Sequence, residues 1–257
     1  MKSAWNPASY LRFEQERTLP SRDLATRIRT IDARSIVDVG CGPGNSTAVL
    51  KEHWPQARII GLDSSGAMIA KARSAHPEWE WLLADAETWS TGERFDVIFS
   101  NAALQWMSDP AIVTSNLFAH LNEGGALAVQ IPLIGESPLH RALVAVSERD
   151  AWAKLLRNAG ISRNHFDESF YYNHLSTLTP HIEMWITIYL HVMESHRDII
   201  DWYSSTGMRP FLDRISDEGG KKRFAQEVLD ACRPEYPVQR DGRVLFPFKR
   251  LFFVARK

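Results

Sequence analysis

The fold of this chain is decided by the stretch Ser35-Ile36-Val37-Asp38-Val39-Gly40-Cys41-Gly42-Pro43-Gly44-Asn45-Ser46-Thr47. An apolar run that suits a buried strand leads into three glycines at alternate positions. A helix start follows, for which Asn45, Ser46 or Thr47 can provide the cap. Strand, glycine turn and helix is an arrangement that brings backbone N–H groups and a helix N-terminus beside a ligand.

Two acidic residues follow this turn at informative distances. Asp63 ends the next apolar run, Arg58 to Leu62, and lies about 20 residues on, where a carboxylate would bond a ribose hydroxyl. Asp85 ends a third apolar run, Trp81 to Ala84. We therefore expect the glycines, Asp63 and Asp85 to meet at the carboxyl edge of a parallel sheet.

Apolar runs and helical patterns alternate along the rest of the chain. We predict strands at 35–39, 57–62, 80–83, 95–99, 126–131, 182–192 and 244–255, the last interrupted at Pro247, and a turn at Gly124-Gly125. Residues 1–34 suggest two short helices broken near Pro20, with Ser21 as a cap for the second. The alternation favours an α/β fold with a parallel sheet and helices on both faces. We expect one domain over 1–257.

Composition limits the function classes. The chain has 257 residues, of which 44% are hydrophobic and 24% charged, and its net charge is −1. Such a balance gives no global attraction to nucleic acid or to an acidic membrane. No apolar run approaches the ~20 residues of a membrane span, and the first residues lack a signal-like apolar core. Two cysteines form no disulfide framework, which favours a cytoplasmic protein.

The motifs resemble those of class I S-adenosylmethionine (SAM) methyltransferases. Asp38 to Gly44 is similar to the first motif of that family, Asp63 to its ribose acid, and Asp85-Ala86 to its adenine-contacting motif. Phe95 to Asn101 is similar to its fourth strand. The resemblance implies a Rossmann-like, seven-stranded, mostly parallel sheet with an antiparallel last strand. It also implies helical cap segments at about 136–160 and 195–235, lid helices within 1–34, SAM as cofactor and S-adenosylhomocysteine as product.

The resemblance also implies roles for individual residues. Asp63 would accept from the ribose hydroxyls, Asp85 would accept from the adenine amine, and Met68 would pack on the adenine face. Asn101 would lie near the methionine portion, and Asp38 would orient the glycine turn from beneath. The complete predicted cofactor set is Asp38, Gly40, Cys41, Gly42, Gly44, Asp63, Ser64, Met68, Asp85, Ala86 and Asn101, with Tyr10, Arg17 and Arg22 from the lid. Arg17 and Arg22 are equal candidates for the cofactor carboxylate.

Four further stretches resemble a narrower group of this family, carboxyl O-methyltransferases that act on a small tricarboxylate. They are Trp5 to Pro20, Asn101 to Trp106, Thr206 to Leu212, and Gly242 to Phe248. Unreacted carboxylates need cationic or hydrogen-bonding partners. The candidates are Arg209, Trp106, Arg141, Tyr171, Tyr172 and His191, together with His140, and Arg209 is preferred for its place in the third stretch. Because a carboxylate acceptor is ionised at neutral pH, we expect positioning, no catalytic base and no metal.

Other functions remain open at this point. A nicotinamide-dependent oxidoreductase would use a similar turn, but its fingerprint asks for glycine where this chain has Asn45. A methyltransferase could instead act on another small carboxylic acid, a quinone precursor or an RNA base, although the charge balance does not favour RNA. A protein that holds SAM without catalysis is a third alternative. The sequence leaves the oligomeric state open.

Overall fold

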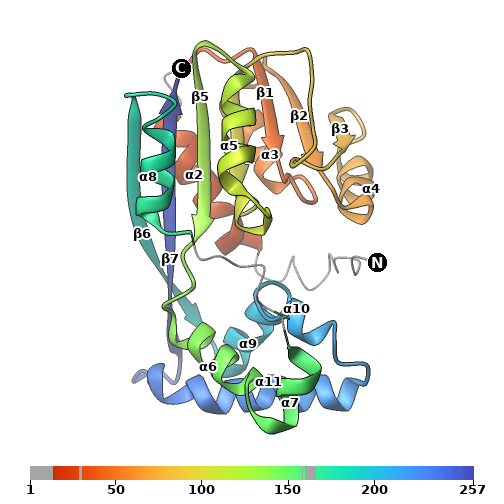
Figure 1. The fold of residues 1–257 in the computed structure, drawn as a ribbon, viewed down its shortest axis with the longest axis vertical. Coiled ribbons are helices and arrows are strands. Elements are labelled where there is room, and N and C mark those ends of the chain that lie inside the picture. Colours follow the sequence, from red (N-terminus) through yellow and green to blue (C-terminus); the bar gives the residue numbers. More distant parts are fainter. Residues whose placement is uncertain (1–13, 29–30, 158, 160–165) are drawn as a thin grey trace. The chain divides into compact units, whose positions relative to one another are not determined.

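The computed structural model describes residues 14–28, 31–157, 159 and 166–257 (Figure 1). The described chain divides into two compact units. We call the first the sheet unit, which comprises residues 14–28, 31–132, 166–187 and 250–257. We call the second the helical unit, which comprises residues 133–157, 159 and 188–249. Each unit is described by itself.

Seven strands form one sheet in the order β3-β2-β1-β4-β5-β7-β6. The strands are β1 Ser35–Val39, β2 Arg58–Asp63, β3 Glu80–Leu83, β4 Phe95–Asn101, β5 Leu121–Pro132, β6 Ile182–Met193 and β7 Val244–Arg256. β1 pairs in parallel with β2 and β4, and β7 pairs antiparallel with β5. This confirms the predicted seven-stranded, mostly parallel sheet with an antiparallel last strand. The strand order reverses between β1 and β4, where ligands bind in open α/β sheets.

Helices occupy both units. The sheet unit contains α2 Glu14–Ile28, α3 Asn45–His53, α4 Gly66–Ala75, the 3-10 turn η1 Leu104–Trp106, α5 Pro110–Ala119 and α8 Glu168–Leu175. The helical unit contains α6 Pro138–Ser147, α7 Asp150–Leu156, α9 His196–Ser204, α10 Arg209–Leu212, α11 Glu218–Cys232 and η2 Arg233–Glu235. In Figure 1, α2 and α3 lie on one face of the sheet, and α5 and α8 lie on the other. No helix among the described residues is long and apolar enough to span a bilayer.

The break predicted near Pro20 is wrong, because α2 runs through this proline. Its buried residues, Pro20, Ser21, Leu24, Ala25 and Ile28, recur at helical spacing and form one stripe. α2 packs on α3 and β5. Burial of a continuous stripe offsets the hydrogen bond that proline removes from a helix. Ser21 is consequently an interior residue and not a cap.

β5 also differs from its prediction. It begins at Leu121, five positions before the predicted start at Ala126, and the predicted turn at Gly124-Gly125 lies within it. Gly124 has φ +76°, and the pairing with β4 shifts register between Phe95 and Val97. These features are typical of a bulge, which bends a strand without ending it.

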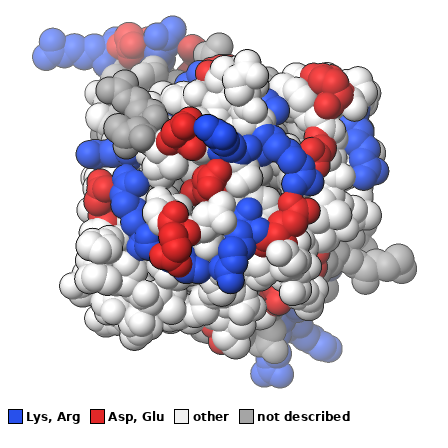
Figure 2. Space-filling model, turned by 90° about the horizontal axis from the view of Figure 1, so that it is seen from above, with Lys and Arg blue, Asp and Glu red and all other residues white. Residues whose placement is uncertain are grey.

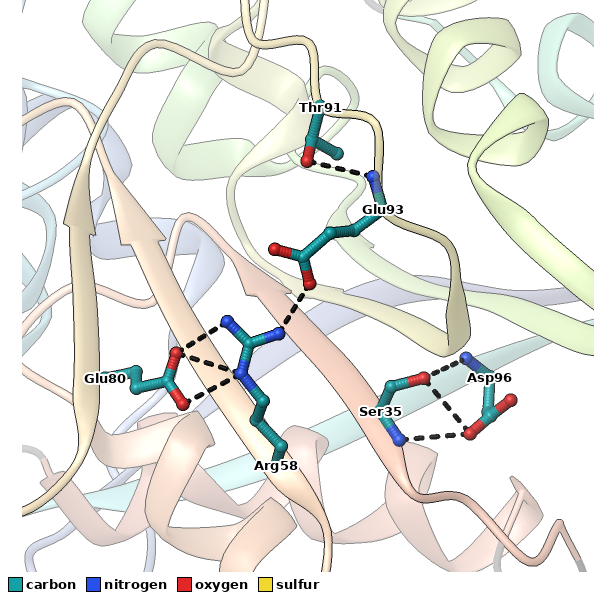
Figure 3. Close-up of polar contacts among 6 residues, drawn as sticks. All are labelled: Ser35, Arg58, Glu80, Thr91, Glu93 and Asp96. Carbon is teal, nitrogen blue, oxygen red and sulfur yellow. Dashed lines mark hydrogen bonds and ion pairs between the residues drawn. The ribbon is translucent and has the colours of Figure 1, made fainter.

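Polar contacts tie the strands together near their amino ends (Figure 3). Arg58 of β2 bonds Glu80 of β3 at 2.8 Å and also pairs with Glu93. The Ser35 N–H donates to the Asp96 carboxylate at 3.0 Å, which joins β1 to β4. The Arg58 pairs are solvent-exposed and contribute little stability each. On the face in Figure 2, basic and acidic side chains are interspersed, so it presents no patch of one sign.

Candidate functional site

The glycine turn, Gly40 to Gly44, connects β1 to α3 at the carboxyl edge of the sheet. Gly40, Gly42 and Gly44 have φ of +74°, +56° and +102°, which side chains other than glycine rarely adopt. The N–H groups of Gly40 and Cys41 donate to the Leu62 carbonyl of β2 at 2.7 and 3.0 Å. The turn is therefore held against the end of the neighbouring strand, and Cys41 is buried within it.

Two glycines in this turn face different surroundings. A Cβ on Gly40 would lie 2.2 Å from the Cβ of Ala103, in the segment that follows β4. A Cβ on Gly42 would have no heavy atom of the described residues within 4 Å. Gly40 thus permits close packing between the ends of β1 and β4, whereas Gly42 borders open space that a ligand can enter.

Asp63 joins the end of β2 to this turn. Its Oδ2 accepts from the Gly42 N–H at 2.9 Å, and its Oδ1 accepts from the Ser65 N–H at 2.8 Å. Burial raises the pKa of this carboxyl, and the two backbone hydrogen bonds oppose that rise. The carboxylate is half-buried, and the neighbouring Ser64 is exposed. Its lone pairs beyond these two bonds can therefore accept from a ligand hydroxyl.

Asp38 fixes the start of α3 from within β1. Its fully buried Oδ2 accepts from the hydroxyls of Ser46 and Thr47, both at 2.6 Å. Its Oδ1 has no hydrogen-bond partner among the described residues. Burial raises the pKa of Asp38 to about 6. The negative charge of Asp63 also raises this pKa, whereas the hydrogen bonds from the two hydroxyls lower it. Sequence reasoning did not identify the two hydroxyl partners.

The raised pKa of Asp38 predicts a pH-dependent stability. The folded chain holds a proton on Asp38 up to about pH 6, whereas the unfolded chain releases it near the ordinary aspartate value. The stability contribution is therefore present at low pH and lost as pH rises. In urea titrations from pH 4 to 6, the free energy of unfolding of the native chain should fall by about 2 kcal/mol relative to Asp38→Asn. Parallel curves for the two proteins would contradict this.

Asp96 provides a matched control of opposite sign. Burial alone would raise the pKa of Asp96, but hydrogen bonds from Asn122, Arg34 and Ser35 outweigh it and lower the pKa. Its stabilising contribution is present above the ordinary aspartate pKa and lost as pH falls through the lowered one. The free energy of unfolding of Asp96→Asn should therefore fall furthest below that of the native chain at neutral pH, and the difference should be smallest in acid.

The predicted adenine contacts follow β3 and begin α4. Asp85 is half-buried and accepts from the Glu87 N–H at 3.1 Å. Ala86 is buried, as is Met68 in the first turn of α4. The Ser65 hydroxyl accepts from the Met68 N–H at 3.4 Å and caps this helix. An acceptor and two apolar side chains suit a planar base with an exocyclic amine.

Polar atoms without partners gather where β4 and β5 end. The Oδ1 of Asn101 and the Oε1 of Gln105 are buried and have no hydrogen-bond partner among the described residues. Ala102 between them has φ +56°, a conformation uncommon for a residue with a side chain. Gln130 of β5 pairs with Asn101, and its Oε1 accepts from Arg250 of β7 at 3.1 Å.

Sequence reasoning missed Gln130 and Arg250. A usable signal was present, since Gln130 interrupts the apolar run 126–131, and Arg250 together with Lys249 interrupts the run 244–255. Both side chains are buried in the structure. A buried amide beside a buried guanidinium at the carboxyl edge of a sheet is a candidate for ligand binding.

The predicted lid residues are only partly described. Tyr10 lies outside the described residues, as does the side chain of Arg17, although Arg17 belongs to α2. Arg22 forms an ion pair with Glu52, with Nη2 and Oε1 3.1 Å apart. Glu52 lies in the last turn of α3, seven positions after Asn45, which begins the helix next to the glycine turn. Seven steps along an α-helix span about 10 Å. Arg22 therefore points to the opposite end of α3, which argues against its predicted contact with the cofactor.

Three predicted substrate residues belong to the sheet unit. Tyr171 is fully buried, and its ring packs 5.2 and 5.3 Å from those of Phe170 and Phe253. Burial raises the pKa of its hydroxyl far above the ordinary value. It is a core residue of α8, which argues against the predicted substrate contact. Tyr172 is 55% exposed, and Trp106 in η1 is 40% exposed.

The remaining substrate candidates belong to the helical unit. Arg209 begins α10 and pairs with Asp213, with Nε and Oδ2 3.4 Å apart. Arg141 of α6 is exposed and donates to the Glu136 carbonyl. His191 is buried, with its ring 4.8 Å from that of Trp202, which argues for a packing role. His140, also buried, bonds the Tyr203 hydroxyl through Nδ1 at 2.9 Å.

The arrangement in the sheet unit fits a nucleoside that carries an amino-acid tail. Asp63 can accept from ribose hydroxyls beside the open space over Gly42, and Met68 and Ala86 provide an apolar wall. The unpartnered Oδ1 of Asn101 can accept from an ammonium group. These residue types in these places therefore fit SAM.

Comparisons with known proteins agree with this geometry. Residues 36–125 match a family model described as a methyltransferase domain. The trans-aconitate 2-methyltransferase of Azoarcus sp. (strain BH72) is 41% identical over 253 residues, covering 98% of both chains. That of Escherichia coli (strain K12 / DH10B) is 40% identical over 257 residues, covering 99% of both. The structure of the plantazolicin methyltransferase BpumL in complex with S-adenosylhomocysteine shares the fold, with a TM-score of 0.53 at 17% identity, over 98% of this chain and 90% of BpumL.

Proposed function

This chain belongs to the trans-aconitate 2-methyltransferase family of SAM-dependent enzymes, and we propose that it methylates a carboxylate of trans-aconitate to form the monomethyl ester. The observation that carries the proposal is identity of about two residues in five over nearly the full length of both relatives. Family membership also removes the nicotinamide-dependent alternative. The carboxyl O-methyl bond is the chemistry that the relatives' name implies for an acid.

The sheet unit would hold the cofactor. Asp63 would bond the ribose hydroxyls while the bond from the Gly42 N–H keeps its carboxylate against the glycine turn and the bond from the Ser65 N–H holds its other oxygen. Asp85 would accept from the adenine amine, with Met68 and Ala86 against the ring. Asn101 would lie near the methionine portion. When bound, SAM supplies a methyl group that its positively charged sulfur has already activated.

The residues of the chain then have to orient the acceptor and exclude water. A carboxylate is ionised at neutral pH, so no side chain needs to remove a proton from it. Holding the two reactants in line can supply most of the acceleration. We propose Arg209 for an acceptor carboxylate that does not react, because a guanidinium binds carboxylates in a fork geometry. Trp106 would form a wall, and Arg141 and Tyr172 are weaker candidates.

We also propose a cytoplasmic enzyme of small metabolites, with no nucleic-acid or membrane partner. Both cysteines, Cys41 and Cys232, are free and buried in the described structure. Burial raises the pKa of the Cys232 thiol to about 11, so it is a poor nucleophile. A reducing compartment suits such a chain.

Methyl transfer from labelled SAM to a panel of acids tests the proposal. The panel holds trans-aconitate, cis-aconitate, citrate, isocitrate and a long-chain acid, with a control lacking acceptor. We expect base-labile incorporation that is strongest on trans-aconitate, because esters hydrolyse in base and methyl ethers do not. Turnover on another acid or on a quinone precursor would retain the cofactor and replace the acceptor. SAM binding without turnover on any acceptor would favour a protein that holds SAM without catalysis.

A further inference from the structure

A row of buried polar side chains crosses three neighbouring strands at the carboxyl edge of the sheet. Asn101 ends β4 and pairs with Gln130 of β5, and Gln130 lies opposite Phe252 of β7. Arg250 lies two positions before Phe252, so its side chain emerges on the same face as that of Gln130. Gln130 is 0% exposed and Arg250 is 4% exposed. We call these three residues the polar row.

The hydrogen bonds within the polar row leave a specific pattern of atoms. Arg250 Nη1 donates to Gln130 Oε1 at 3.1 Å, which orients the amide. The Nε2 of Gln130 has no hydrogen-bond partner among the described residues, and neither has the Oδ1 of Asn101. Burying an amide donor or acceptor without a partner destabilises a protein. A ligand that bonds these atoms would remove that cost.

The pattern matches one kind of group. A guanidinium and an amide N–H₂ are donors, and together they suit a carboxylate, which a guanidinium binds through two parallel bonds. The Asn101 oxygen is an acceptor and suits an ammonium group. A donor pair on β5 and β7 beside an acceptor on β4 fits an amino-acid group, which carries both charges.

The polar row also lies on the part of the sheet edge that follows the glycine turn. β4 neighbours β1, which leads into the glycine turn. Neighbouring strands are about 4.8 Å apart, so β7 lies about 10 Å from β4 across β5. Asp63 ends β2, which is two strand intervals, or about 10 Å, from β4 across β1. A ligand held by Asp63 and the glycine turn therefore reaches the polar row first at Asn101.

We propose that Arg250 and Gln130 form a buried carboxylate-binding site beside Asn101. This inference rests on the proposed function, which supplies two carboxylate sources, the amino-acid end of SAM and an unreacted carboxylate of the acceptor. The acceptor oxygen of Asn101 favours the amino-acid end. Arg250 and Gln130 hold their ligand by hydrogen bonds and charge and take part in no covalent step.

Two nucleosides that differ only in a carboxylate test the site. Binding of S-adenosylhomocysteine and of its decarboxylated analogue is measured by titration calorimetry with the full chain, native and Arg250→Gln. If the cofactor carboxylate binds here, the variant should lose about 10- to 100-fold in affinity for S-adenosylhomocysteine and little for the analogue. Arg250→Lys, which keeps the charge without the fork, should recover part of the loss.

A control and a second variant separate binding from folding. Arg256→Gln removes a guanidinium from the last residue of β7, where Arg256 pairs with Glu183 at 3.6 Å. This control should leave the affinities for both nucleosides unchanged. Gln130→Leu keeps Arg250 but removes the amide, and it should weaken the binding of S-adenosylhomocysteine about 10-fold. If Arg250→Gln does not fold, Gln130→Leu carries the test.

Each outcome has a definite meaning. If Arg250→Gln binds S-adenosylhomocysteine as tightly as the native chain but has a tenfold higher KM for the acceptor, the site binds the acceptor carboxylate. If the S-adenosylhomocysteine affinity and the acceptor KM of Arg250→Gln both stay within twofold of the native values, the proposed site is wrong. It is also wrong if the variant loses equal affinity for S-adenosylhomocysteine and for its decarboxylated analogue. If the native chain binds neither nucleoside, both the proposed function and this inference are wrong. That result is distinct from the others because the native chain, and not only a variant, fails to bind.

Discussion

Replacing Gly40 with alanine should lower the free energy of unfolding by about 2–5 kcal/mol and greatly reduce SAM binding. The left-handed conformation at φ +74° costs about 1–2 kcal/mol for a residue with a side chain. The new methyl group would also lie 2.2 Å from the Cβ of Ala103, which cannot rotate away. Overpacking of this kind costs about 1–3 kcal/mol. Relief requires the segment after β4 to move, and Asn101 would move with it.

Two further variants separate strain from contact. Gly42→Ala has the same kind of strain at φ +56°, but its new methyl group meets no atom of the described part of the chain within 4 Å. It should therefore lower the free energy of unfolding of the unliganded protein by only about 1–2 kcal/mol. The double variant Gly40→Ala/Ala103→Gly removes the Cβ of residue 103 that would lie 2.2 Å away. It should recover the part of the unfolding free energy that the contact with Ala103 costs. Urea denaturation of the three variants measures this. Equal stability of Gly40→Ala and Gly42→Ala would show that the contact with Ala103 is unimportant.

Replacing Asp63 with alanine should weaken S-adenosylhomocysteine binding by about 100-fold, because hydrogen bonds to a charged group are the stronger ones. The substitution removes the proposed ribose contact and both backbone bonds, to Gly42 and to Ser65. The Gly42 N–H then loses its partner, so the turn is also less well held. Titration calorimetry measures the affinity, and thermal unfolding measures the structural cost.

A matched control distinguishes the ribose contact from the structural one. Asp109 caps α5 and accepts from the N–H groups of Ala111 and Ile112 at 3.0 and 3.1 Å. Asp109→Ala should therefore lose about 1 kcal/mol of stability while keeping the affinity. The native chain should also prefer S-adenosylhomocysteine over its 2′,3′-dideoxy analogue, and Asp63→Ala should not. Retention of that preference in the variant would refute the ribose role.

Much of the sheet unit follows from local sequence. Glycines at alternate positions after an apolar run predict the turn between β1 and α3, and Asp63 and Asp85 follow apolar runs that form β2 and β3. These features are predictable because backbone conformation and strand burial depend on residues close in sequence. The bonds of Asp38 to Ser46 and Thr47 do not follow from the local sequence, which indicates these two residues only as possible helix caps.

Distant contacts decided other features, of which the predicted break near Pro20 is one that proved wrong. α2 continues through Pro20 because a stripe of side chains is buried against α3 and β5. Arg22 pairs with Glu52, thirty residues away, and not near the glycine turn. Tyr171 stands in a polar segment of sequence, yet it packs against Phe253 near the end of the chain.

The sequence by itself determined the α/β class, the glycine turn and the acidic residues that follow the strands, because each depends on a short stretch of chain. Only the tertiary structure decided which polar residues meet. Asn101, Gln130 and Arg250 are as many as 149 positions apart in the chain, and the order of β4, β5 and β7 in the sheet makes them neighbours. Strand order is set by how the whole sheet buries its apolar faces, and no local pattern contains that information.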